Sequence, residues 1–273
     1  MCFYRKVKSM NIESLKRQIT SKEIGCEVYF QEEVTSTNTV AKKLAVEGKP
    51  SGTLVVTDFQ SQGKGRRGKT WVAPKGKDIF MSLLLRPAIQ PAQASMLTLV
   101  MGLSVAQVVN DYLGIDAKIK WPNDVVVKAK KICGILTEMN ANASAVDYVV
   151  IGTGINCNAT GFAEAGLSDA TSLFLETGKE VGREVLLAKV LARLEANYNE
   201  FLQTQDLTRL MGDYNSLLAN AEREVRVCGA NEEWTGMAKG INERGELLVE
   251  DREGKIRTIF TGEVSVRGIY GYV

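Results

Sequence analysis

Residues 59–71 read FQSQGKGRRGKTW, a basic, glycine-rich stretch between two apolar runs at 54–56 and 79–85. It holds four cations and three glycines. Glycine lets a backbone approach a ligand closely, and arginine and lysine both neutralise phosphate oxygens. The stretch therefore predicts a loop, between two strands, that closes over a phosphorylated small molecule. A solvated basic turn and a nucleic-acid patch remain open at this point.

Length and charge narrow these alternatives. The chain of 273 residues can hold one sizeable core and a small appended domain. Its 34 Lys and Arg against 32 Asp and Glu give a net charge of +2, too balanced for a dedicated nucleic-acid binder. Residues 1–10 lack the apolar core of a secretory signal, and the longest apolar run, 96–109, is too short to span a bilayer. We expect a cytoplasmic protein without membrane contact.

The chain contains no histidine. This excludes Ser-His-Asp and Cys-His catalysis and every histidine-ligated metal site. The five cysteines are scattered, without a CxxC pair, which is typical of reduced thiols rather than of a disulfide framework or a zinc site. An enzyme of this composition has to work through Lys, Arg, Asp, Asn and backbone amides, with Mg²⁺ at most carried by a phosphate.

The order of expected elements predicts an α+β fold, a mixed β-sheet with helices packed on one side. Strands are expected at 28–30, 52–58, 78–86, within 118–140 and at 147–155, and helices at 39–47, 93–112, 183–202 and 207–219. From residue 222, short alternating segments separated by turn signals predict a small barrel of about five strands. The predicted domains are an N-terminal arm or short helix (1–27), a catalytic domain (28–220) and the barrel (221–273).

Three further stretches carry candidate chemistry. Ser36-Thr37-Asn38 precedes a helix and is interpreted either as its N-cap or as a ligand contact at the helix N-terminus. Trp121-Pro122-Asn123-Asp124 predicts a fixed bend, where Asp124, between Lys120 and Lys128, is either a turn residue or the holder of a metal or reacting amine. Lys131 belongs either to an exposed hairpin turn or to an anionic site.

The strand DYVVIGTGI, 147–155, ends in glycines that suggest a dinucleotide-binding fingerprint. The third glycine is missing and no capped helix follows at once, so this interpretation fails. The glycines are better explained by close packing of the backbone, with Asn156 turned towards a ligand.

In this order and spacing, the stretches STN, QSQGKGRRGKTW, KWPNDVVVKAKKICGIL and VIGTGINCN closely resemble the biotin–protein ligases, also called biotin–[acetyl-CoA-carboxylase] ligases. The resemblance covers about residues 28–270. It implies a class II synthetase-like ligase domain followed by an SH3-like barrel. It also implies a two-step reaction with ATP and Mg²⁺: biotin and ATP form biotinyl-5′-AMP, and a lysine of a biotin carboxyl carrier domain then takes the biotin.

The resemblance assigns roles to residues of this chain. The biotin-binding residues of the family correspond to Ser36, Thr37, Asn38, Gln60, Lys64, Gly65, Arg66, Lys131, Gly134, Leu136 and Gly154. The ATP-binding residues correspond to Lys64, Arg66, Lys69, Trp71, Lys120, Asn123, Asp124, Lys131 and Asn156. Of these, Arg66, Lys131 and Asp124 are predicted to be catalytic, Asp124 as the base for the carrier amine and as a contact to ATP-borne Mg²⁺.

The chain departs from the family pattern in its basic loop. Lys64 and Lys69 stand where the family often has arginine, which keeps the charge but loses the bidentate fork. Three alternatives follow for the whole chain: a lipoate–protein ligase, a nucleic-acid-binding module and a catalytically weak biotin-binding protein. We expect a ligase that binds no operator DNA, because only about 28 residues precede the catalytic part, and we expect a homodimer.

Overall fold

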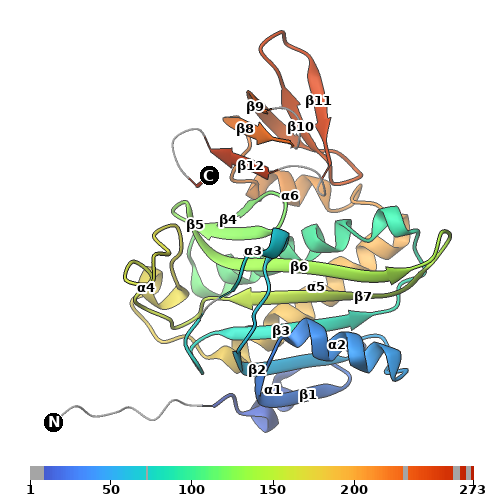
Figure 1. The fold of residues 1–273 in the computed structure, drawn as a ribbon, viewed down its shortest axis with the longest axis vertical. Helices are drawn as coiled ribbons and strands as arrows, with labels where there is room; N and C mark the ends of the chain where they lie inside the picture. Colours follow the sequence, from blue (N-terminus) through green and yellow to red (C-terminus); the bar gives the residue numbers. More distant parts are fainter. Residues whose placement is uncertain (1–8, 72, 230–232, 261–264, 269–271) are drawn as a thin grey trace.

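The computed structural model describes residues 9–71, 73–229, 233–260, 265–268 and 272–273. Figure 1 shows a large sheet with helices against it and a second, smaller sheet at the C-terminal end. The strands of the large sheet are β1 (Val28–Val34), β2 (Leu54–Gln60), β3 (Ile79–Leu85), β4 (Ala117–Lys120), β5 (Asp124–Val127), β6 (Lys130–Ala141) and β7 (Val146–Ile155). The helices are α1 (Ile12–Gln18), α2 (Thr37–Val46), α3 (Met96–Leu113), α4 (Leu173–Thr177), α5 (Arg183–Thr204) and α6 (Met211–Leu217), with 3₁₀ turns η1 (Arg66–Gly68) and η2 (Pro91–Gln93).

The large sheet is mixed, as predicted. Its order is β1-β2-β3-β7-β6-β5-β4, with β1 and β2 parallel and the other neighbours antiparallel. Alternate residues of a strand point to opposite faces, so β7 sends Val149 and Ile151 into the main core and Val150 towards α2. The predicted one-sided cover therefore holds for α3 and α5, whereas α2 packs on the opposite face, over β2, β3 and β7.

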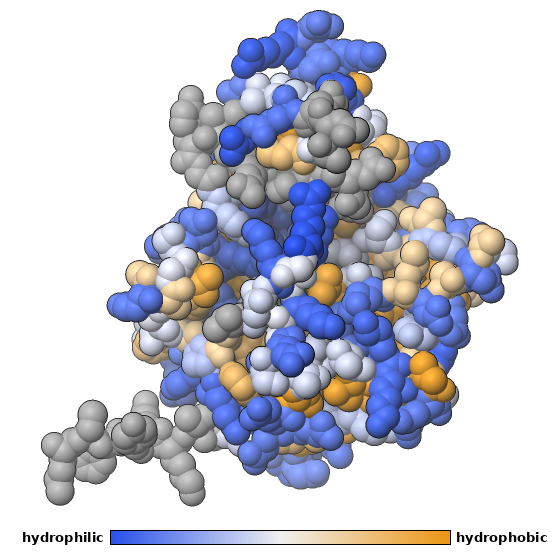
Figure 2. Space-filling model, viewed as in Figure 1, coloured by the Kyte–Doolittle hydropathy of each residue, from blue (hydrophilic) through white to orange (hydrophobic). Residues whose placement is uncertain are grey.

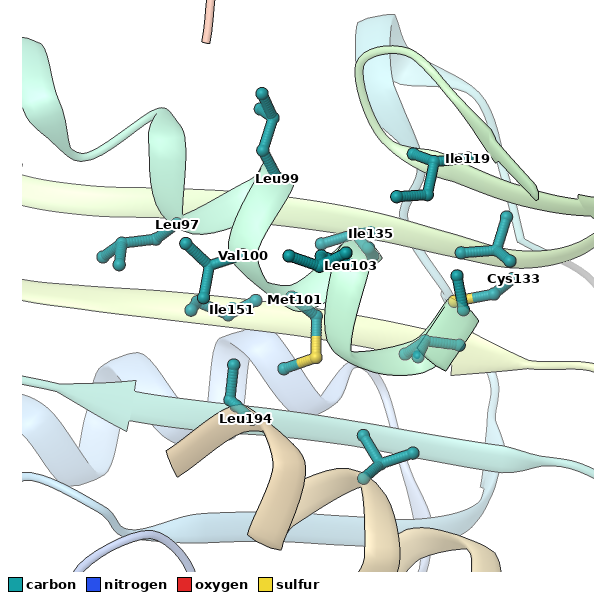
Figure 3. Packing of buried hydrophobic residues seen from close by; sticks show 14 of the residues in the cluster. Leu97, Leu99, Val100, Met101, Leu103, Ile119, Cys133, Ile135, Ile151 and Leu194 are labelled. Carbon is teal, nitrogen blue, oxygen red and sulfur yellow. The ribbon is translucent and has the colours of Figure 1, made fainter. Parts of the chain in front are cut away.

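The main core lies between the sheet and α3. Figure 3 shows Val100 and Leu103 of α3 near Ile135 and Ile151 of the sheet, with Leu194 of α5 beside them. The helical segment Pro91–Leu113, with a mean hydropathy of 1.5, is long and apolar enough to cross a membrane by length and composition. The prediction that the longest apolar segment is too short to span a bilayer, made from residues 96–109, is therefore wrong about its length. Since 72% of its apolar window is buried inside the protein, its hydropathy is explained by its place in the core.

The C-terminal sheet has the order β11-β10-β9-β8-β12. Its strands are β8 (Arg223–Cys228), β9 (Glu233–Ile241), β10 (Leu247–Glu250), β11 (Ile256–Ile259) and β12 (Ser265–Gly268), close to the five predicted segments. The turn before β10 contacts the part of the chain that holds the large sheet, because the buried Trp121 donates a hydrogen bond from Nε1 to the carbonyl oxygen of Gly245 at 3.0 Å. The hydrophobic side chains of the two parts form one continuous core.

A buried carboxylate, Asp78, holds the chain after β7 against the start of β3. Its Oδ1 accepts hydrogen bonds from the backbone N–H groups of Cys157, Asn158 and Ala159 at 2.8, 3.2 and 3.2 Å. Its Oδ2 has no hydrogen-bond partner among the residues that the structure describes. Burial raises the pKa of Asp78 to about 6, against the opposing effects of the three N–H groups and of Arg183.

This raised pKa predicts a pH-dependent stability. Because the pKa of Asp78 is higher in the folded than in the unfolded chain, its protonation stabilises the fold at low pH, and this stability is lost as the pH rises through about 6. Asp78→Asn cannot titrate, so its free energy of unfolding should rise relative to the wild type by about 2 kcal/mol between pH 4.5 and 7.5. Urea unfolding at the two pH values measures this, and an unchanged difference would contradict it.

Candidate functional site

A cavity lies on the same face of the sheet as α2. It is lined by Ser36, Thr37, Asn38, Gln60, Lys64, Gly65, Arg66, Trp71, Met81, Asn123, Lys131, Gly134, Ile135, Leu136, Gly152, Thr153 and Gly154. These residues come from the start of α2, the basic loop, strands β2, β3, β6 and β7, and the turn between β4 and β5. Figure 2 shows hydrophilic residues gathered across the middle of this face, and Figure 1 shows the loop after β2 crossing the sheet there.

Glycines make room for the cavity. Gly134 of β6 and Gly154 of β7 are paired across the two strands. A Cβ atom on Gly134 would lie 2.5 Å from the Trp71 ring, and one on Gly154 would lie 2.9 Å from it. A Cβ on Gly152 would lie 2.1 Å from Asn38 Oδ1. The prediction that the glycines of β7 serve close packing is confirmed.

The N-terminus of α2 is fixed by a polar cluster. Ser36 is the N-cap residue, but its side chain makes no capping hydrogen bond. Thr37 donates from its backbone N–H to Gln60 Oε1 at 2.8 Å, and Asn38 donates from Nδ2 to Glu138 Oε2 at 2.7 Å. Thr37 and Asn38 are buried and line the cavity. The segment Ser36–Asn38 therefore begins the helix, as the N-cap interpretation predicts, and also borders the cavity, where it could contact a ligand.

The basic loop is ordered by its own backbone. Gly65 donates to the carbonyl oxygen of Lys69 at 2.7 Å, and Trp71 donates to that of Gly63 at 2.9 Å. A Cβ on Gly63 would lie 2.5 Å from the Trp71 carbonyl oxygen, so the hairpin needs glycine there. This hairpin brings Arg66 to Asn123, whose Oδ1 accepts a hydrogen bond from Nη1 at 2.9 Å.

Lys131 reaches the same cavity from β6. Its Nζ lies 2.6 Å from Asp124 Oδ1 and 5.2 Å from the centre of the Trp71 ring. The hairpin turn itself is Lys128–Ala129, both with positive φ, so Lys131 lies beyond the turn and its side chain is three-quarters buried. This decides between the two interpretations of Lys131 in favour of the inward one.

Three cations from two separate segments therefore border one cavity: Lys64 and Arg66 of the basic loop, and Lys131 of β6. Burial and the neighbouring Arg67 lower the pKa of Arg66, and the nearby Asp124 carboxylate opposes this shift. Arg66 and Lys131 thus lie around a single acidic side chain, with net positive charge left over. Such a site favours an anionic ligand, because a second negative charge completes the neutralisation.

Four predicted site residues do not line the cavity within the described structure: Lys69, Lys120, Asp124 and Asn156. Lys69 is exposed. Asn156 is buried, and its Nδ2 donates to the carbonyl oxygen of Thr171 at 2.9 Å. Lys120 and Asp124 are neighbours across β4 and β5. The roles of these residues towards ATP stay predictions.

The surroundings of Asp124 do not fit a magnesium ligand. Its Oδ1 lies 2.6 Å from the Lys131 ammonium and 3.2 Å from Asn123 Nδ2, and its Oδ2 accepts a hydrogen bond from Tyr272. Both oxygens are thus engaged by donors. Among the described residues, no three acidic or cysteine side chains gather to hold a metal ion.

Several residues at the site were not predicted. Ser82 Oγ lies 2.7 Å from Thr37 Oγ1 and 2.6 Å from Asn38 Oδ1, and Glu138 forms an ion pair with Lys42 at 2.8 Å. Burial raises the pKa of Glu138, but hydrogen bonds from Lys42 and Asn38 outweigh it, and the net shift is downward. Ser82 had a signal, a hydroxyl within the apolar run IFMSLLL, whereas Glu138 and Tyr272 had none.

The comparisons with known proteins agree with this geometry. Residues 30–156 match the biotin/lipoate A/B protein ligase family, and residues 222–267 match the biotin protein ligase C-terminal domain. The bifunctional ligase/repressor BirA of Bacillus spizizenii is 35% identical over 89% of this chain and 75% of that protein. The biotin–[acetyl-CoA-carboxylase] ligase of Paracoccus denitrificans is 31% identical over 81% of this chain and 92% of that protein.

A solved structure shares both the fold and the arrangement of domains. The biotin protein ligase of Aquifex aeolicus, in complex with biotin and ATP, superposes with a TM-score of 0.78 at 32% identity, over 89% of this chain and 99% of that one. The mixed sheet with its helices and the C-terminal sheet thus follow the class II synthetase-like ligase fold with its SH3-like domain. The chain belongs to the biotin protein ligase family.

Proposed function

We propose that this protein activates biotin with ATP and transfers it to a lysine of a biotin carboxyl carrier domain. The observation that carries the proposal is the cavity in which Arg66 and Lys131 meet the polar cluster at the N-terminus of α2. A polar end and a cationic end in one pocket suit a small acid with a polar head group. The family to which the chain belongs supports biotin as that acid.

In the first step, an oxygen of the biotin carboxylate attacks the α-phosphorus of ATP. A bond forms between that oxygen and phosphorus, the bond to the bridging oxygen breaks, and pyrophosphate leaves with the electron pair. Negative charge builds up on the α-phosphate oxygens in the transition state. Arg66 and Lys131 would stabilise it, because preorganised charges at the reacting atoms make the largest contribution in such sites.

In the second step, the amine of the carrier lysine attacks the carbonyl carbon of biotinyl-5′-AMP and AMP leaves. The mixed anhydride must be kept from water until the carrier arrives. The hairpin of residues 63–71 lies over this part of the sheet. Its Trp71 ring covers Gly134 of β6 and Gly154 of β7. We propose that this cover excludes water from the adenylate, as closed loops do in other enzymes.

Asp124 was predicted to take the proton of the carrier amine. Its ion pair with Lys131 favours another role, because both oxygens of the carboxylate already accept hydrogen bonds from residues of this chain. We propose that Asp124 orients Lys131. Asp124→Asn measured with preformed adenylate separates the two roles: loss of only the first step supports orientation, and loss of the second supports the base.

The proposed activity is tested by biotin-dependent exchange of pyrophosphate into ATP. We expect exchange with biotin and none with lipoate, since the alternative of a lipoate–protein ligase predicts the reverse. Incubation with ATP, biotin and a carrier domain, followed by streptavidin blotting, then tests transfer. Binding of biotin without exchange would reveal a catalytically weak biotin-binding protein instead.

We also propose that this chain does not bind operator DNA. The relative from Bacillus spizizenii is named a bifunctional ligase/repressor. Here, the net charge of +2 supports the proposal, because dedicated nucleic-acid binders are strongly basic. A sequence-selective, salt-resistant gel shift on a biotin-gene promoter would overturn this. A cytoplasmic location and a homodimer stay predictions.

A further inference from the structure

The side chain of Tyr272, from the segment after the C-terminal sheet, lies in the ligase domain. Its hydroxyl donates a hydrogen bond to Asp124 Oδ2. Its ring faces Lys120, with Nζ 3.6 Å from the ring centre. Because Lys120 and Asp124 are paired across β4 and β5, one aromatic side chain contacts neighbouring residues of two strands. The C-terminal part of the chain thereby contacts a residue that pairs directly with Lys131.

The other oxygen of Asp124 contacts Lys131, which lines the cavity. Oδ1 lies 2.6 Å from Lys131 Nζ and accepts a weaker hydrogen bond from Asn123 Nδ2 at 3.2 Å. Asp124 is 8% exposed, so water does little to hold its carboxylate. The orientation of this carboxylate therefore depends on its protein donors. A donor fixed on Oδ2 prevents rotation of the carboxylate and keeps Oδ1 on the lysine.

We propose that Tyr272 is a positioning residue of the adenylation site, acting on Lys131 through Asp124. This inference rests on the proposed function and adds a residue from the C-terminal segment to it. Tyr272 is not among the residues that line the cavity, so it touches no reacting atom there. The Tyr272 hydroxyl fixes the orientation of the Asp124 carboxylate, and this carboxylate positions the Lys131 ammonium. The ammonium would then contact the α-phosphate of ATP.

The ring and the hydroxyl of Tyr272 have separate contacts. The ring covers Lys120, which is 7% exposed, through a cation–π contact. The hydroxyl, and not the ring, donates the hydrogen bond to Asp124. Tyr272→Phe keeps the first contact and removes the second. In this variant, Asp124 Oδ2 loses the hydrogen bond from the Tyr272 hydroxyl. The change therefore affects the orientation of the Asp124 carboxylate more than the packing of the ring.

Tyr214→Phe is a matched control. Tyr214, in α6, is buried, whereas Tyr272 is partly exposed, and the Tyr214 hydroxyl has no hydrogen-bond partner among the described residues. It does not line the cavity. This variant removes a hydroxyl from the same chain without touching Asp124, and its exchange activity should equal that of the wild type.

The experiment measures biotin-dependent pyrophosphate exchange. It compares the wild type with Tyr272→Phe, Tyr214→Phe, Asp124→Ala and the double variant that combines Tyr272→Phe with Asp124→Ala. We expect Tyr272→Phe to lower kcat about tenfold while the KM for biotin changes less than about twofold, since Lys131 acts on the transition state. In the Asp124→Ala background, the same change should cost less than about twofold, because its target is gone. Both phenylalanine variants should remain folded at the assay temperature, with the thermal midpoint of Tyr272→Phe lower than that of Tyr214→Phe by at most a few degrees.

The outcomes are distinct. A wild type without biotin-dependent exchange overturns the proposed function and this inference with it. An active wild type with an equally active Tyr272→Phe overturns the inference alone. So does a tenfold loss that persists without Asp124, because Tyr272 then acts by another route. A lowered kcat that accompanies a much lower thermal midpoint would show a merely structural role and would overturn it as well.

Discussion

Replacing Lys131 with methionine should lower kcat for adenylate formation by about 10²–10³, the usual cost of removing one preorganised donor from a developing oxyanion. Methionine fills a similar volume without the charge. The loss should fall on kcat more than on the KM for ATP, because the α-phosphate gains its extra charge only in the transition state. Pyrophosphate exchange at saturating biotin measures both constants.

The adjacent Lys130 provides the control for this prediction. It lies on the same strand, but its side chain is exposed and does not line the cavity. Lys130→Met should therefore exchange pyrophosphate like the wild type, and Lys131→Arg, which keeps the charge, should recover part of the lost rate. Equal activity of Lys130→Met and Lys131→Met would show that Lys131 does not act at the phosphate.

The loss in Lys131→Met must be separated from a loss of folded protein. Asp124 is 8% exposed and would lose its cation, and an unpaired buried charge destabilises a fold. The thermal midpoint of each variant should therefore be measured at the assay pH. Combining Lys131→Met with Asp124→Asn removes both charges, which should restore stability without restoring exchange.

The sequence predicted most of the elements, because these features depend on local patterns, whereas the meeting of the basic loop with Lys131 was predicted only by the family resemblance. Apolar alternation marked the strands, and glycine marked the loop after β2 and the close packing along β7, whereas only the structure shows that the Trp71 ring is what lies against these glycines. The resemblance then brought the separate stretches together. Each of these signals can be read within about a dozen residues.

What escaped prediction depends on contacts between distant segments. Glu138 meets Asn38 across 100 positions, and Tyr272 meets Asp124 across 148. No local pattern says that the end of the chain returns to the ligase domain. Likewise, the predicted roles of Asp124 in binding Mg²⁺ and accepting a proton treated the carboxylate as free, and only the packed structure shows that Lys131, Asn123 and Tyr272 engage it.

The second large effect is expected at Gly152, one of the glycines of β6 and β7 that lie close to the side chains of Trp71 and Asn38. Gly152→Ala should raise the KM for biotin by about 100-fold, because the new Cβ would lie 2.1 Å from Asn38 Oδ1 and 2.8 Å from its Cγ. The Gly152 backbone is compatible with alanine, since its φ is not positive, so the effect is one of space. Overpacking by one methyl group costs about 1–3 kcal/mol. Displacing Asn38 would also break its hydrogen bonds to Glu138 and to the carbonyl oxygen of Leu136.

Gly152→Ala is expected to change the KM for biotin, whereas Lys131→Met is expected to change kcat. The polar cluster around Asn38 is proposed to hold the head group of biotin, in the ground state and the transition state alike. Its displacement should therefore weaken binding and leave kcat at saturating biotin nearly unchanged. Gly212→Ala, in α6, is the control, because a Cβ there meets nothing within 4 Å. Calorimetric titration with biotin decides: if Gly152→Ala binds biotin as tightly as Gly212→Ala does, the N-terminus of α2 does not hold the head group.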